Sequence, residues 1–219
     1  MKNRIVKSEK CASALPMMRK LRHGLRLCAA LFIFSFFHFF ISSCTGESEY
    51  SSEPCYFAFQ NATFLDETLA TAMNPDSRGV FCQISQSFSG GVNYIVFANN
   101  QGLSSQQKET AYEQRTNYVI GINNGIIVGY QTLNDSPNGG FAAYDLQCPN
   151  CYRKHQSYTN PKFRLSMSSS GIATCSSCGK HYDMNNRGVI QDGEEGDVNL
   201  TQYVATTTGP LGYLLVHNR

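Results

Sequence analysis

Four cysteines in two closely spaced pairs constrain the fold of this chain more than any other feature. They read Cys148-Pro-Asn-Cys151 and Cys175-Ser-Ser-Cys178, with 23 residues between the pairs. Two residues between cysteines let a tight turn aim both sulfurs at one point, and Gly179 suits such a turn after the second pair. Two such knuckles placed face to face bring four thiolates to the corners of a tetrahedron. The sequence therefore predicts a metal site made by all four cysteines.

Two other uses of these cysteines fit the spacing. In an oxidising compartment the four thiols can pair as two disulfides. A Cys-x-x-Cys pair is also the redox motif of thiol–disulfide oxidoreductases, but no βαβ pattern surrounds either knuckle here. If the four cysteines share one metal, no coordination position stays open, which argues against hydrolytic zinc catalysis.

The chain begins with a segment typical of a secretory signal. Basic residues within 19–26 precede an apolar run of 15 residues, 27–41, whereas about 20 are needed to cross a bilayer core as a helix. The run ends in Ile41-Ser-Ser-Cys44, which resembles a lipobox, the cleavage site of bacterial lipoproteins. This resemblance implies that residues 1–43 are removed and that Cys44 carries a lipid anchor.

Removing residues 1–43 changes the sign of the net charge. The whole chain carries +2, but these residues hold 8 of the 18 Lys and Arg and 1 of the 16 Asp and Glu, which leaves −5. An acidic chain without a basic cluster gives no support for nucleic-acid binding. Residues 44–55 then form the lipidated cysteine and a polar tether. Because Thr45 stands where an aspartate often retains lipoproteins at the inner membrane, the resemblance implies an envelope protein anchored in the outer membrane.

The rest of the chain, 56–219, has the pattern of one all-β domain. Short runs rich in β-branched and aromatic residues alternate with glycine and asparagine turns, such as Asn124-Gly125. The stretch Phe64–Met73 is the best short helix, and 105–116 is expected to add a helical turn. These signals predict a β-sandwich or barrel. The expected strands are Tyr56–Phe59, Val80–Ile84, Val92–Phe97, Tyr118–Ile122, Ile126–Gln131, Phe141–Leu146, Gly188–Ile190, Tyr203–Thr206 and Tyr213–Val216.

Beyond the signal segment and Cys44, two further cysteines, Cys55 and Cys82, lie outside the knuckles. An envelope compartment permits a disulfide between them, and we expect that pairing. The alternative is that each is buried separately as a small apolar residue.

The order of motifs after residue 141 resembles a Rieske-type iron–sulfur domain, and the similarity extends over about residues 75–219. The resemblance implies a β-sandwich or barrel base with an inserted metal-binding subdomain at 144–187. In it, Cys148 and Cys175 fall on the family's two cysteines, and Cys178 falls on its second histidine. The motifs that carry it are Phe141-Ala-Ala-Tyr-Asp-Leu-Gln-Cys148-Pro, Cys175-x-x-Cys178-Gly-x-x-Tyr182-Asp183, Gly188-Val189, Leu200-x-x-Tyr203 and Gly212-Tyr-Leu-Leu-Val216.

Three positions depart from the family pattern. The family's first histidine falls on Asn150, and a cysteine follows it at Cys151. Lys180 replaces a serine that bonds the cluster, and a loop that carries a proline in the family reads Gly193-Glu-Glu195. Moving the ligand to Cys151 turns the first loop into a knuckle, which is typical of a rubredoxin or zinc-ribbon site around one ion.

Four thiolates also change the chemistry expected of the metal. Two neutral imidazoles give the Rieske cluster its high potential, whereas four thiolates favour values nearer roughly −400 mV than +300 mV. Zinc has no redox chemistry and binds four thiolates in a closed tetrahedron, and rubredoxin-like iron shares that geometry. We therefore expect zinc in a structural or binding role. The alternative is an electron-transfer protein with a rubredoxin-like iron or a [2Fe–2S] centre.

Other polar residues are expected around the metal or on the surface. His155, Lys180 and His181 lie close to the knuckles and are candidates for the shell outside the four sulfurs. The acidic residues at 192–197 are expected to form a solvated turn. No nucleophile and base stand together in the sequence, so we assign no catalytic residue and do not expect an enzyme, unless as an oxidoreductase component.

Overall fold

A computed structural model describes residues 49–133 and 140–219 of the chain. The predicted signal sequence and the lipidation residue Cys44 lie outside the described residues. Within those two ranges, no helix is both long and apolar enough to span a membrane.

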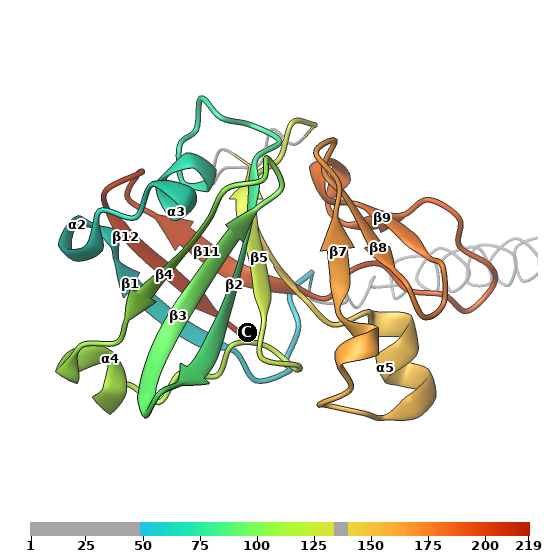
Figure 1. The fold of residues 1–219 in the computed structure, drawn as a ribbon. Helices are drawn as coiled ribbons and strands as arrows, with labels where there is room; N and C mark the ends of the chain where they lie inside the picture. The colour runs from blue at the N-terminus through green and yellow to red at the C-terminus, as the bar shows by residue number, and fades with distance from the viewer. Residues whose placement is uncertain (1–48, 134–139) are drawn as a thin grey trace, which may run out of the picture. The chain divides into compact units, whose positions relative to one another are not determined.

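The larger part of the fold is one antiparallel sheet of eight strands, curled into a half-barrel (Figure 1). Its strand order is β1-β12-β11-β6-β5-β2-β3-β4. Every neighbouring pair in it is antiparallel. The strands are β1 (Tyr56–Gln60), β2 (Phe81–Ser89), β3 (Val92–Asn99), β4 (Ser104–Lys108), β5 (Ile126–Tyr130), β6 (Phe141–Asp145), β11 (Gln202–Thr207) and β12 (Tyr213–His217).

Apolar side chains on one face of this sheet form the main core. Phe57, Phe59 and Phe97 meet there with ring centroids 5.2–5.9 Å apart, in stacked and tilted pairs. Helix α3 (Glu67–Ala72) follows the short helix α2 (Asn61–Phe64) and packs its apolar face on strands β2, β3 and β5. The Asp66 side chain caps α3 by accepting from the Leu69 amide at 3.0 Å. Helix α4 (Ala111–Arg115) begins with a capping box.

A second, four-stranded sheet is inserted between β6 and β11, which are neighbours in the large sheet. The chain therefore leaves the large sheet after Asp145 and returns to it at Gln202. The small sheet has the order β10-β9-β8-β7. The strands of the small sheet are β7 (Leu165–Met167), β8 (Ile172–Cys175), β9 (His181–Asp183) and β10 (Val189–Ile190). The insertion also contains helix α5 (Pro149–His155) and the 3-10 helices η1 (Pro161–Phe163) and η2 (Met184–Asn186).

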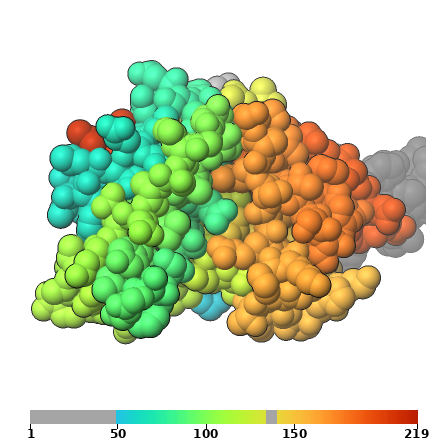
Figure 2. Space-filling model, viewed as in Figure 1, coloured from blue at the N-terminus to red at the C-terminus, as the bar shows by residue number. Residues whose placement is uncertain are grey.

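A second core joins the insertion to the outer face of the large sheet. Phe81, Ile127 and Tyr144 project from that sheet into it, and Leu165 and Tyr182 project from the insertion. Figure 2 shows the insertion, coloured orange, packed directly against the green strands. Both faces of β5 and β6 are thus covered. This explains why both strands are buried throughout and, apart from Asp145 at the end of β6, do not alternate between apolar and charged residues.

The predominantly β character is confirmed: the structure is mostly β with 17% helix. The predicted strand Tyr118–Ile122 is wrong, because only an isolated bridge between Val119 and Tyr56 forms there. The helical turn expected in 105–116 is present as α4, but β4 occupies the start of that stretch. Strands β7–β9 were not predicted, because runs of three or four residues give no clear periodicity. Helix α5 was not predicted either, because its seven residues are mostly polar and span barely two turns.

A buried carboxylate marks the point where the chain leaves the large sheet. Asp145 accepts from the Ile122 amide at 2.7 Å, the Gln147 amide at 2.6 Å and the Tyr203 hydroxyl at 2.6 Å. Its side chain is fully buried. Burial raises the pKa of Asp145 to about 6, although the three donors act in the opposite direction.

Because of this raised pKa, we expect the folded state to lose stability as the pH rises from about 4 to about 6. The folded state holds the Asp145 proton more tightly than the unfolded state, so the free energy of unfolding falls as pH rises through this window. A shift of about two pKa units corresponds to roughly 3 kcal/mol. Urea unfolding at pH 4.5 and 7.5 should show the decline in the wild type and not in Asp145→Asn, which cannot titrate. An equal pH response in the two proteins would show that Asp145 is not the group responsible.

Candidate metal centre

The first knuckle is built at the start of helix α5. Cys148 is the N-cap residue, and Pro149 follows at the first helical position, where its missing N–H removes no helical bond. The Tyr152 amide donates to the Cys148 carbonyl at 2.9 Å, which closes the first turn. Cys151 lies within that turn, so both sulfurs lie at the same end of the helix. Cys148 and Cys151 are both buried.

The second knuckle connects β8 to β9. Cys175 ends β8, and its amide donates to the Lys180 carbonyl at 3.0 Å. The Gly179 amide donates back to the Cys175 carbonyl at 2.8 Å. Gly179 has φ +74°, a value that residues with a Cβ rarely adopt, so glycine permits this turn. The turn leaves Cys175 buried and Cys178 exposed.

The two knuckles bring their sulfurs to coordination distance. The Sγ atoms of Cys148 and Cys178 are 3.6 Å apart, those of Cys151 and Cys175 are 3.7 Å apart, and all four lie within 4.8 Å of one another. A tetrahedral zinc site with Zn–S bonds of about 2.3 Å has sulfurs about 3.8 Å apart. A disulfide needs about 2.05 Å. The cluster has the spacing of a metal site, and it can hold a metal ion.

Burial and hydrogen bonds shift the pKa values of three of the four thiols, and not all in the same direction. The hydrogen bond to Cys175, together with burial, raises the pKa of Cys148, and burial raises that of Cys151 to about 12. The pKa of Cys175 is lowered to about 5, because the Cys148 thiol and the amides of Cys178 and Ser177 donate to its sulfur. Without a cation, Cys148 and Cys151 therefore favour the neutral thiol, and a bound metal ion would favour their thiolate forms.

A tyrosine and an asparagine bond the first knuckle to the chain around it. The Tyr182 hydroxyl lies 3.3 Å from the Cys148 sulfur and accepts from Asn150 Nδ2 at 2.9 Å. That leaves the hydroxyl proton for the sulfur. Asn150 also exchanges two hydrogen bonds of 3.0 Å with the backbone of Val198. Sequence reasoning did not assign these roles, although Tyr182 belongs to the motif that carries the family resemblance.

The residues predicted for the outer shell have other partners. Lys180 Nζ pairs with Asp197 at 2.8 Å, and the His181 ring bonds Asp192 at 2.8 Å on the surface. The ring of His155 stacks on Phe163 with centroids 5.1 Å apart. The acidic turn therefore supplies two of its carboxylates to the residues of the second knuckle.

Cys55 and Cys82 are two buried free thiols in the main core. The expected disulfide between them is not formed, and their surroundings differ. Gly121 and Asp145 lie near Cys55, whereas Ala98 and Asp66 lie near Cys82. Burial raises the pKa of Cys55 to about 12 and also raises that of Cys82. Both residues therefore serve as small apolar core side chains, the alternative role considered for them.

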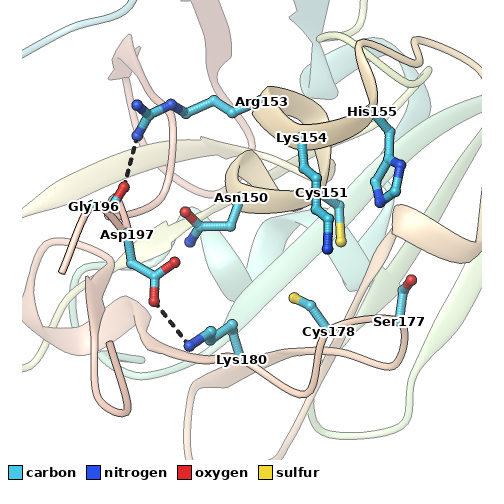
Figure 3. A pocket seen from close by; sticks show the side chains of 10 residues that line it. All are labelled: Asn150, Cys151, Arg153, Lys154, His155, Ser177, Cys178, Lys180, Gly196 and Asp197. Carbon is cyan, nitrogen blue, oxygen red and sulfur yellow. Dashed lines mark hydrogen bonds and ion pairs between the residues drawn. The ribbon is translucent and has the colours of Figure 1, made fainter. Parts of the chain in front are cut away.

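A pocket of about 580 Å³ opens beside the four sulfurs. Helix α5, the second knuckle and the loop residues Gly196 and Asp197 line it (Figure 3). Cys178 and Cys151 both contribute to its wall. One side of the cysteine cluster is therefore open to solvent.

Comparisons with known proteins add no assignment to this geometry. The chain matches no family model, and no curated protein or solved structure is significantly similar to it.

Proposed function

We propose that the chain binds one metal ion through Cys148, Cys151, Cys175 and Cys178, and that the ion holds the inserted subdomain together. The observation that carries this proposal is the convergence of four sulfurs to within 4.8 Å of one another. The Cys148–Cys178 pair at 3.6 Å and the Cys151–Cys175 pair at 3.7 Å each join the α5 knuckle to the β8–β9 turn. One ion would therefore link the two halves of the insertion at a single point.

The spacing favours a single ion over a two-iron cluster. In a [2Fe–2S] cluster, two irons and two bridging sulfides lie between the thiolates, so thiolates on different irons are farther apart than those on the same iron. Here all four sulfurs lie within 4.8 Å of one another, which fits ligands of a single ion. Zinc is the ion we propose, because four thiolates form its preferred closed shell and leave no coordination position open.

The ion would contribute folding free energy to the insertion. The small sheet has strands of two to four residues, and three of the four cysteines belong to the second core, which the insertion shares with the large sheet. Strands this short bury little apolar surface among themselves. In many small domains, a structural zinc site supplies the folding free energy that the apolar core does not.

Metal analysis and colour test this function together. Protein purified without oxygen is expected to contain one zinc per chain and to be colourless. A red-brown protein that bleaches on reduction would instead support an electron-transfer centre containing iron. The exposed Cys178 is the observation that favours this second candidate, because it brings the centre to the surface, where an electron can leave. Metal-free protein would contradict both.

We also propose that the chain is anchored by a lipid and that its domain is a divergent relative of the Rieske-type domains. The lipobox-like sequence at Cys44 supports an envelope protein held by a lipid. The insertion between neighbouring strands β6 and β11, and the bond from Tyr182 to Cys148, support a divergent Rieske-type domain with a changed ligand set. The mass of the mature N-terminal peptide tests the anchor: unmodified Cys44 would contradict it.

A further inference from the structure

The pocket beside the cysteine cluster reaches Cys178, the exposed member of the four ligand cysteines. Cys148, Cys151 and Cys175 are buried, and Cys178 is exposed. A molecule that delivers or removes the metal ion must contact the ion directly. The buried sulfurs shield the ion on its other sides. The open side coincides with the 580 Å³ pocket, whose wall includes Cys178.

Positive charge is concentrated around this opening. Arg153 and Lys154 come from α5 and Lys180 from the second knuckle, whereas Asp197 is the one carboxylate that lines the pocket in the described chain. Residues 44–219 carry a net charge of −5, so the pocket differs in sign from the rest of the protein. Cations in the last turn of a helix interact well with its dipole, but that explanation does not extend to Lys180, which lies outside α5.

Lys154 is the cation that is free to meet a ligand. Arg153 donates to the Gly196 carbonyl at 3.1 Å, and Lys180 pairs with Asp197 at 2.8 Å. Across residues 49–133 and 140–219, Lys154 forms no ion pair. Its side chain extends into the space between α5 and the second knuckle (Figure 3).

We propose that this pocket is the route of metal exchange, and that it admits small anionic chelators that carry carboxylate or phosphate groups. With an ion bound, an oxygen of the chelator would replace the Cys178 thiolate as a ligand, and the released thiolate would take a proton from water and leave hydroxide. No electron is transferred in this step. The remaining sulfurs then follow as the ion moves into the chelator, and loading runs in reverse. This inference rests on the proposed metal site.

Zinc release from the full-length, zinc-loaded protein tests the proposal with two probes. One is a polycarboxylate chelator, EDTA, and the other is an uncharged pyridyl chelator of similar affinity. Lys154→Gln should slow release to EDTA roughly threefold or more at low salt, because an attractive charge has been lost. Release to the uncharged chelator should not change. Added salt should remove the difference by screening.

Lys162→Gln is the matched control, since it removes the same charge from η1, outside the pocket. It should leave both release rates unchanged. Equal slowing with both chelators in Lys154→Gln, or no slowing with either, would overturn the exchange route while leaving the metal site intact. Absence of zinc from the wild-type protein would instead overturn the proposed function itself, so the two failures are distinguishable.

Discussion

Cys175→Ser is expected to lose the metal ion and to unfold the inserted subdomain while the large sheet stays folded. Cys175 is fully buried, it ends β8, and its sulfur lies 3.7 Å from that of Cys151. A serine hydroxyl is a poor ligand for a thiolate site and is left in an apolar core. Zinc binding contributes roughly 10–16 kcal/mol in small zinc domains, so we expect a loss on the order of 5 kcal/mol.

Two measurements check this result. Elemental analysis should fall from one zinc to nearly none, and hydrogen exchange should increase across 146–201. Cys82→Ala is the control, because it removes a buried thiol from the main core and leaves the cluster unchanged. It should keep its zinc. A Cys175→Ser protein with full zinc content would contradict the proposed ligand set.

Gly129→Ala is expected to destabilise the domain by about 3 kcal/mol or more. A Cβ at this position would lie 2.3 Å from the Val80 carbonyl oxygen, 2.8 Å from Phe81 Cδ1 and 3.0 Å from Phe81 Cα. Two of these three atoms belong to the backbone, so a rotamer change cannot relieve the contact. Gly129 pairs with Phe81 across β5 and β2, where Phe81 joins the second core. Overpacking in such a place usually costs about 1–3 kcal/mol, and backbone clashes cost more.

Gly193→Ala provides the comparison for this substitution. Its new Cβ would approach Ile190 Cγ2 at 2.8 Å, but that atom is a methyl group of a partly exposed side chain, and rotation about χ1 can move it. Thermal or urea unfolding should therefore show a small change for Gly193→Ala and a large one for Gly129→Ala. Similar stabilities for the two variants would mean that β2 and β5 separate more easily than the packing indicates.

The sequence predicted the parts of the fold that carry long regular patterns. Strands such as β3, with alternating buried and exposed residues, were expected close to their observed bounds. Strands β7–β9 were missed because their apolar residues, such as Leu165 and Ala173, are too few to set a period. Val119 belongs to an apolar run that reads as a strand, but it forms only one bridge there.

At the metal centre, spacing predicted the ligands, and three-dimensional packing supplied the rest. The four cysteines converge because each knuckle is a local structure, a helix start or a tight turn, that sequence can encode. The hydrogen-bond network of Asn150, Tyr182 and Val198 joins residues up to 48 positions apart, so no local sequence pattern predicts it. His155 and His181 were candidates for the shell around the metal because of their residue type. The His155 ring stacks on Phe163, and the His181 ring bonds Asp192.

X-ray absorption at the metal edge tests the central claim most directly, because it measures which atoms surround the ion. For the protein as purified, we expect a zinc signal with one shell of four sulfur neighbours at about 2.3 Å. Nitrogen or oxygen neighbours in that shell, or a second metal a few ångströms away, would contradict a single ion held by Cys148, Cys151, Cys175 and Cys178.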